Sequence, residues 1–253
     1  GIDIGRRCAA ASMSDVCAMG TTPTTLLVAM AAPSSTPYAL IREIFTGLVE
    51  EAAVAGAQVV GGDMSASEKI IVSVTAMGVS PKKGIPKRSD AKVGDIVAVN
   101  GVLGRAAAGL RILQRGLRAP RVLVDAYRYP IIDYQAGEKA KNAGAHAMID
   151  ISDGLVADLG HLAKASGVSI NIETTSLPIT DELASTASAF GVDPMQWVLT
   201  GGDDNVLAAT FDSSAALPDG FYAIGEVTTL GENYIMIDGE TAPVGGGFTH
   251  FRG

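Results

Sequence analysis

The chain has 253 residues, of which 47% are hydrophobic, and it carries a formal net charge of −8 at neutral pH. A chain of this size can bury a sizeable core in one large domain or two smaller ones. Its acidic balance argues against a nucleic-acid-binding protein, which would present a basic surface, and no apolar run approaches the roughly 18 residues needed to span a bilayer. Two cysteines, Cys8 and Cys17, are too few for a disulfide framework and fit a reducing cytoplasm.

Helical and strand-like patterns alternate along the first part of the chain. Amphipathic periodicity predicts helices, and short runs rich in β-branched residues predict strands. The predicted elements are a helix at 4–20, a strand at 24–31, a helix at 37–57, a short apolar run at 58–60 and a buried strand at 69–80. The polar stretch at 81–95, rich in Pro, Gly and Lys, is the best candidate for a domain boundary.

A second block of elements follows this stretch. The predicted elements are a strand, glycine turn and helix at 96–116, two helical segments, an apolar strand ending at Asp150 and then a helix, a strand at 168–178, a helix at 179–191, and strands at 205–211, 221–227 and 233–239. Strands and helices mixed in two blocks predict an α/β (or α+β) protein with two lobes.

The chain begins at Gly1 rather than at a methionine and enters a helical pattern almost at once. We therefore expect the natural polypeptide to be longer at its N-terminus and the additional segment to contain acidic residues.

Four short motifs combine aspartate with glycine or another small residue, and we interpret them as acidic turns near the ends of elements. They are "SMSDVCAMG" with Asp15, "VVGGDMS" with Asp63, "DISDG" with Asp150 and Asp153, and "LTGGDDN" with Asp203 and Asp204. Glycine allows a backbone to approach a phosphate closely, and aspartate supplies the hard oxygen ligands that magnesium prefers. Any one of these motifs alone is more often an ordinary turn or surface acid. Their recurrence predicts a shared magnesium–nucleotide site.

The junction "DISDGLVADL" has a simpler structural interpretation as well. Ser152 or Asp153 can cap the following helix, and Asp158 is expected to be an ordinary first-turn acid whose replacement by Asn does little. Capping needs only one side chain, however, so it does not account for Asp150. The sequence contains neither a Walker A motif nor the protein-kinase motif set, and "GVLGRAAAG" lacks the lysine of a P-loop.

Taken together, the motifs resemble the thiamine-monophosphate kinase family of the aminoimidazole-ribonucleotide-synthetase-like superfamily. The resemblance extends from about residue 5 to residue 251, and "DISDGL" is its most specific element. The motifs that carry it, in the family's order and approximate spacing, are "MSDVCAMG", "VVGGDMS", "KRSDAKVGD", "DISDGLVADL" and "GGDDNVLAATF".

The resemblance implies a two-domain fold and an activity. The N-terminal domain, placed at residues 1–90, would bind ATP and magnesium and form a homodimer through its strands, and residues 91–253 would form a C-terminal α/β domain. The implied enzyme is a cytoplasmic kinase that uses ATP and Mg²⁺ to convert thiamine monophosphate into thiamine diphosphate.

The resemblance also implies roles for individual residues. The implied magnesium ligands are Asp15, Asp63, Asp150 and Asp153; the implied ATP-binding residues are Gly62, Asp63, Arg88 and Ser152; and the implied substrate-binding residues are Asp203 and Phe248. One departure concerns the substrate. The family usually has Gly-Gly-Glu-Asp followed by an aromatic residue or histidine, where this chain has Asp203 and Asn205, so the carboxylate is one methylene shorter.

The residue inventory agrees with transfer to a phosphate acceptor. Transfer to an alcohol benefits from a general base, whereas a phosphate monoester oxygen is already ionised near neutral pH. His146, His161 and His250 lie outside the acidic motifs in the sequence, and we interpret His146 and His161 as structural. The sequence therefore predicts neither a catalytic base nor a covalent nucleophile.

Two alternatives stay open. One is another ATP-using enzyme of the same superfamily; "DISDGL" and the lack of a cysteine in a glycine-rich N-terminal loop argue against it. The other is a non-catalytic nucleotide-binding dimer scaffold, which the altered "GGDDN" motif keeps open. Turnover of thiamine monophosphate separates this scaffold from a kinase.

Overall fold

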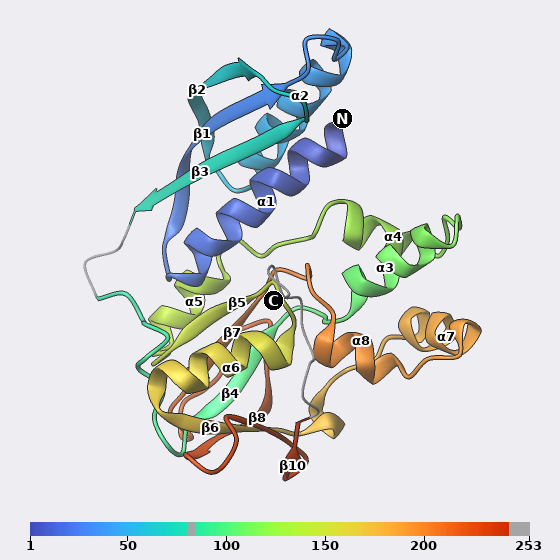
Figure 1. Ribbon diagram of the computed structural model, residues 1–253. Coiled ribbons are helices and arrows are strands. Elements are labelled where there is room, and N and C mark those ends of the chain that lie inside the picture. The colour runs from blue at the N-terminus through green and yellow to red at the C-terminus, as the bar shows by residue number, and fades with distance from the viewer. Residues whose placement is uncertain (80–83, 243–253) are drawn as a thin grey trace.

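The computed structural model describes residues 1–79 and 84–242, and within these residues it contains a three-stranded and a seven-stranded sheet (Figure 1). The elements are, in chain order, α1 Ile2–Ala18, β1 Thr22–Ala32, α2 Tyr38–Val54, β2 Gln58–Ala66, β3 Ile71–Val79, β4 Ile96–Asn100, α3 Arg105–Gln114, α4 Arg121–Arg128, α5 Ala136–Asn142, β5 Met148–Ile151, α6 Leu155–Ser166, β6 Val168–Ile172, the 3₁₀ turn η1 Thr174–Ser176, α7 Asp181–Phe190, α8 Pro194–Thr200, β7 Val206–Phe211, β8 Phe221–Thr229, β9 Ile235–Ile237 and β10 Glu240–Thr241. No helix within the described part of the chain is long and apolar enough to cross a membrane.

The smaller sheet has the strand order β2-β1-β3, with β1 parallel to β2 and antiparallel to β3. Alternate residues of β1 point to one face of this sheet, as strand geometry requires, and α1 and α2 cover that face. The buried side chains that meet there include Met13, Leu26, Val28, Met30, Ile44 and Leu48. The helices pack on one side, so the opposite face of the sheet is exposed.

This one-sided packing corrects the prediction of a buried strand at 69–80. The residues of β3 alternate between exposed and half-buried, and those of β2 are almost all exposed. A run of β-branched residues indicates a strand but does not indicate whether both of its faces are covered.

The larger sheet has the order β10-β9-β6-β8-β4-β7-β5 and carries helices on both faces. One face packs against α3, α4, α6, α7 and α8 in the largest hydrophobic core, and the other packs against α5 and the end of α1. Most predicted elements are confirmed, whereas α8 and β10 were not predicted. The signal for α8 was present, since Asp193 accepts a hydrogen bond from the Met195 N–H and Pro194 occupies the first helical position.

Helix α1 joins the two sheets, because it packs beneath the smaller one and also contacts β5, α4 and α5 (Figure 1). A buried polar cluster fixes this arrangement. Glu51 of α2 is 3% exposed; its Oε2 accepts a hydrogen bond from Arg6 Nε of α1 at 3.1 Å, and its Oε1 accepts one from the Tyr134 hydroxyl at 2.7 Å. Tyr134 lies between α4 and α5, so the cluster attaches this later segment to both N-terminal helices.

Replacing Tyr134 with Phe should lower the free energy of unfolding by about 2 kcal/mol, because it leaves one oxygen of a buried carboxylate without a donor. Urea denaturation measures this difference. The matched control is Tyr38→Phe, since Tyr38 is 76% exposed, and this change should stay within about 0.5 kcal/mol of the parent protein. Equal effects of the two substitutions would show that the Glu51 cluster does not join these segments.

Candidate functional site

Strand pairing brings together two acidic motifs that lie about fifty residues apart in the sequence. The edge strand β5 pairs antiparallel with β7, with Ile151 opposite Val206, so the turn after β5 meets the turn before β7. The Asp203 N–H donates to the Ser152 carbonyl at 2.8 Å, and the Asn205 N–H donates to the Ile151 carbonyl at 2.9 Å. The "DISDG" and "GGDDN" motifs therefore form one hydrogen-bonded unit.

Glycines permit this close contact between the two turns. A Cβ at Gly154, which has φ 121°, would lie 2.9 Å from the Thr200 carbonyl oxygen, and a Cβ at Gly202 would lie 2.7 Å from the Ser152 carbonyl oxygen. A side chain at either position would push the backbones apart. The glycines of both motifs thus have a packing role, in addition to any contact with a ligand.

Three of the four predicted metal ligands lie close together. Asp150 is 5% exposed, and burial raises its pKa, with a further increase from the nearby charge of Asp153. Asp15 approaches from α1, and its pKa is raised by partial burial and by the charge of Asp150. Arg88 opposes these shifts, with Nη2 at 4.0 Å from Asp150 Oδ1. Asp15, Asp150 and Asp153 form a group that we call the acidic group.

Asp158 has a different role from the one expected of it. It is 4% exposed, and its Oδ2 accepts hydrogen bonds from the backbone N–H groups of Ser152, Asp153 and Gly154 at 2.9, 2.9 and 3.1 Å. Burial raises its pKa to about 6, although these N–H groups oppose the shift. The expectation of an ordinary first-turn acid was wrong, because the side chain points back into the turn and away from solvent.

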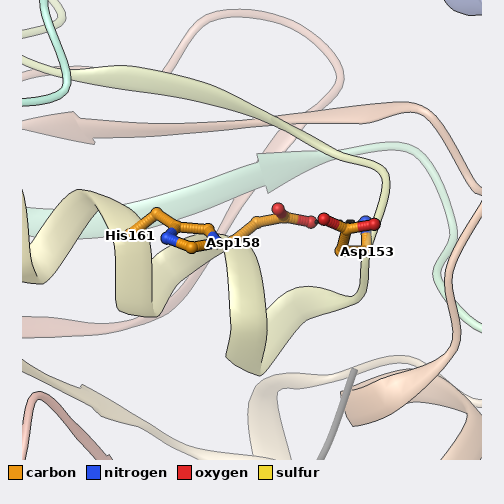
Figure 2. A group of neighbouring side chains, drawn as sticks. All are labelled: Asp153, Asp158 and His161. Atoms are coloured by element: carbon orange, nitrogen blue, oxygen red, sulfur yellow. Dashed lines mark hydrogen bonds between the residues drawn. The ribbon is translucent and has the colours of Figure 1, made fainter. Parts of the chain in front are cut away.

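His161 also lies near the acidic group, which its position in the sequence did not suggest. Figure 2 shows its ring on α6 beside Asp158, whose carboxylate points toward Asp153 in the turn. One ligand atom from each of these three residues lies within 4.8 Å of the others, which is a spacing that suits a metal ion, but three backbone N–H groups of the turn already occupy Oδ2 of Asp158. The structural interpretation fits His146 better, since its Nδ1 lies 2.9 Å from Oδ1 of the buried Asp95.

Two neighbouring aspartates in the "GGDDN" turn point to different partners. Asp203, with φ 70°, forms an ion pair with Arg7 of α1 at 2.7 Å, and half of its side chain remains exposed. Asp204 is 7% exposed and accepts hydrogen bonds from the N–H groups of Gly104 and Ala106 at the start of α3. Asp203 is therefore available to a ligand, whereas Asp204 caps a helix that lies a hundred residues earlier.

An open groove of about 790 Å³ runs beside the paired turns. Its walls include polar side chains from both turns together with one aromatic side chain of α8; the residues that matter here are Arg111, Ser152, Asp153, Gln196, Trp197 and Asp203. The groove is therefore lined both by the Trp197 ring and by Asp153, one member of the acidic group.

The remaining predicted residues lie elsewhere. Gly62 and Asp63 are within β2, and Asp15 is within α1, so two of the four expected acidic turns are in fact parts of regular elements. A Cβ at Gly62 would lie 1.8 Å from the Val28 carbonyl oxygen, which gives this glycine a packing role. Asp63 is exposed, and no ion pair or side-chain hydrogen bond to it occurs among the described residues. Phe248 lies outside the described residues.

Comparison with known proteins identifies the family. The family model for AIR synthase related protein, N-terminal domain, matches residues 1–80, and the model for the C-terminal domain matches residues 92–237. Thiamine-monophosphate kinase from Mycobacterium tuberculosis is 41% identical over 239 residues, which are 94% of this chain and 71% of that protein. The Corynebacterium glutamicum protein of the same name is 34% identical over 98% of this chain and 76% of its own length. The chain belongs to the thiamine-monophosphate kinase family.

A solved member of this family has the same fold. The structure described as AaThiL complexed with AMPPCP and TMP matches with a TM-score of 0.92 and 31% identity, over 99% of this chain and 81% of that one. The α/β architecture expected from the resemblance is therefore confirmed. Division of the chain between residues 90 and 91 stays a prediction, and that position lies in the segment that connects the two sheets.

The buried acids of this family member should make its stability fall with rising pH. Burial raises the pKa of Asp158 to about 6 and that of Asp204 to about 7, from an ordinary value of 3.8. Between pH 3.8 and about pH 7, the folded protein binds more protons than the unfolded chain. The free energy of unfolding therefore decreases as the pH rises through this range.

Urea denaturation of the metal-free protein should show a loss on the order of 4 kcal/mol between about pH 5 and pH 7.5. Asp204→Asn should flatten this dependence, whatever its overall stability, whereas the exposed Asp181→Asn should retain it. A slope in the Asp204→Asn protein that equals the parent slope would contradict the raised pKa.

Proposed function

We propose that this protein transfers the γ-phosphoryl group of ATP to the phosphate of thiamine monophosphate, giving thiamine diphosphate and ADP. The observation that carries the proposal is the acidic group at the edge of an open groove, in a chain that belongs to the thiamine-monophosphate kinase family. The related solved structure holds AMPPCP and TMP, an ATP analogue and the acceptor.

The residues of the acidic group fit a divalent cation, which we propose to be Mg²⁺. Asp15, Asp150 and Asp153 offer carboxylate oxygens, the ligands that magnesium prefers, and their mutual repulsion leaves an unbalanced negative charge. Arg88, 57% exposed and 4.0 Å from Asp150, balances only part of that charge. When bound, magnesium would screen the repulsion between two phosphate groups. Asp63, which lies on β2 of the other sheet, would complete the ligand set in the family's pattern.

Ser152, Trp197 and Asp203 line the groove, whereas Arg88 and Gly62 are not part of its lining. Arg88, Gly62 and Ser152 are the proposed ATP-binding residues; a guanidinium can hold phosphate through two parallel hydrogen bonds. Trp197 in the groove offers an aromatic surface to the thiamine rings, and the half-exposed carboxylate of Asp203 faces the cationic thiazolium. Phe248 stays a proposed contact to the rings.

Holding the donor and acceptor phosphates in line accounts for much of the catalysis in phosphoryl transfer. The acceptor oxygen is ionised near neutral pH, so the reaction requires no base from the protein. The proposed enzyme therefore works by direct in-line transfer, and the side chains position the substrates and balance their charges.

A homodimer in the cytoplasm completes the proposal. The face of the smaller sheet that no helix covers carries several exposed apolar side chains, among them Leu27, Ile71, Met77 and Val79. A second copy of the chain packed on this face would remove them from water.

Replacing Asp150 with Asn should lower kcat at least about 100-fold, because it removes a proposed metal ligand and even outer-shell partners of a metal can cost 10–100-fold. Coupled-enzyme detection of ADP with thiamine monophosphate as acceptor measures the loss, and Asp181→Asn serves as the exposed-acid control. The variant should stay folded, since the change also removes a buried charge from a group of like charges. Normal turnover by Asp150→Asn would exclude the metal-ligand role.

Unphosphorylated thiamine should not be a substrate, because its hydroxyl would need a base and it lacks the phosphate that positions the acceptor. Incubation with ATP, Mg²⁺ and either acceptor, followed by chromatographic separation of the products, tests this.

His161→Gln should retain most of the activity, since direct transfer uses no imidazole. Phosphorylation of thiamine, or loss of activity in His161→Gln with unchanged metal binding, would overturn direct transfer. Binding of ATP without turnover of either acceptor would instead indicate a nucleotide-binding scaffold.

A further inference from the structure

Asp158 is a carboxylate that the proposed chemistry does not use, although it lies in contact with the turn that carries two of the proposed metal ligands. It is the fourth residue of α6, and its Oδ2 receives three backbone N–H groups from the turn that precedes the helix. In a usual capping box an acid at the third helical position reaches back to a single N–H group. Here one oxygen holds three successive residues of the turn.

The position of Asp158 is energetically unfavourable for a charged carboxylate. Asp158 is 4% exposed, and the charges of Asp150 and Asp153 both act against its ionised form. Simple helix capping would not require a fourth carboxylate among like charges, because the N-cap position itself can be filled by a neutral Ser or Thr. The three N–H groups that converge on one oxygen provide the compensation.

We propose that Asp158 is a positioning residue for the metal-binding turn. By drawing the N–H groups of residues 152–154 toward the start of α6, it fixes the backbone between Asp150 and Asp153 (Figure 2). The carboxylates of those two residues are then left to meet a divalent cation together with Asp15. This inference rests on the proposed function for the identity of the ligands, but the positioning of the turn can be measured without catalysis.

The first measurement is hydrogen–deuterium exchange of the metal-free protein. The amides of residues 152–154 should be protected in the parent protein and should exchange at least about 10-fold faster in Asp158→Asn, because a neutral amide oxygen is a weaker acceptor than a carboxylate. Exchange in β7 should stay unchanged. The control Asp181→Asn also replaces an acid in the first turn of a helix, but an exposed one, and it should leave both regions as they are.

The second measurement is calorimetric titration with AMPPCP at increasing Mg²⁺ concentration. Asp158→Asn should need about 10-fold more Mg²⁺ for half-maximal AMPPCP binding, because substitutions of residues that support metal ligands typically weaken metal affinity by 10–100-fold. High Mg²⁺ should restore AMPPCP binding and, in a separate assay with ATP, kcat. A purely structural role would lower the free energy of unfolding without changing the Mg²⁺ requirement of the folded fraction.

Unprotected amides at 152–154 in the parent protein would overturn the proposal without any variant. An unchanged Mg²⁺ requirement in folded Asp158→Asn would overturn it as well. If the parent protein binds Mg²⁺ and AMPPCP but does not phosphorylate thiamine monophosphate, the proposed function fails while the role of Asp158 is still decided by exchange and titration.

Discussion

Repulsion between carboxylates is the constraint around which this region of the molecule is built. Burial is the main cause of the raised pKa values of Asp158 and Asp15; the charges of Asp150 and Asp153 add to the shift of Asp158, and that of Asp150 adds to the shift of Asp15, so the four charges lie within electrostatic reach of one another. Two unit charges about 4 Å apart near a protein surface interact by about 4 kcal/mol, a large share of a domain's net stability. A fold that gathers such charges must supply positive partners to each.

The backbone supplies most of that compensation for the buried acids. Three N–H groups point at Asp158, two at Asp204, and Arg88 approaches Asp150. Asp15 and Asp153 receive no comparable set of donors among the described residues. The charge left over is therefore concentrated on Asp15 and Asp153, and of these two Asp153 lines the open groove.

Helix α1 determines how the N-terminal and C-terminal parts of this site meet. It carries Asp15 toward β5, and two successive arginines on it reach the C-terminal part: the Arg6 guanidinium stacks on the Tyr129 ring, and that of Arg7 stacks on the Tyr127 ring while pairing with Asp203. These contacts fix α1 against the segment that follows α3. Asp203 is thus shared between an interaction that joins the two parts of the protein and a groove that can accept a cationic ligand.

The sequence by itself determined the order of the elements and predicted the chemical type of the site. Amphipathic periods and β-branched runs located nearly all helices and strands, because the periodicity of the side chains follows the geometry of each element. The recurrence of aspartate beside glycine predicted a metal–phosphate site, because aspartate supplies hard oxygen ligands and glycine allows a backbone to approach a phosphate closely.

Only the tertiary structure decided which acids act together. Asp153 and Asp158 look alike in the sequence, yet one is available to a ligand and the other is held by three N–H groups of the backbone. Likewise, Asp204 caps a helix that precedes it by a hundred residues, because β5 and β7 pair beside that helix. Local sequence cannot encode these partners, since strand pairing and helix packing bring them together from distant parts of the chain.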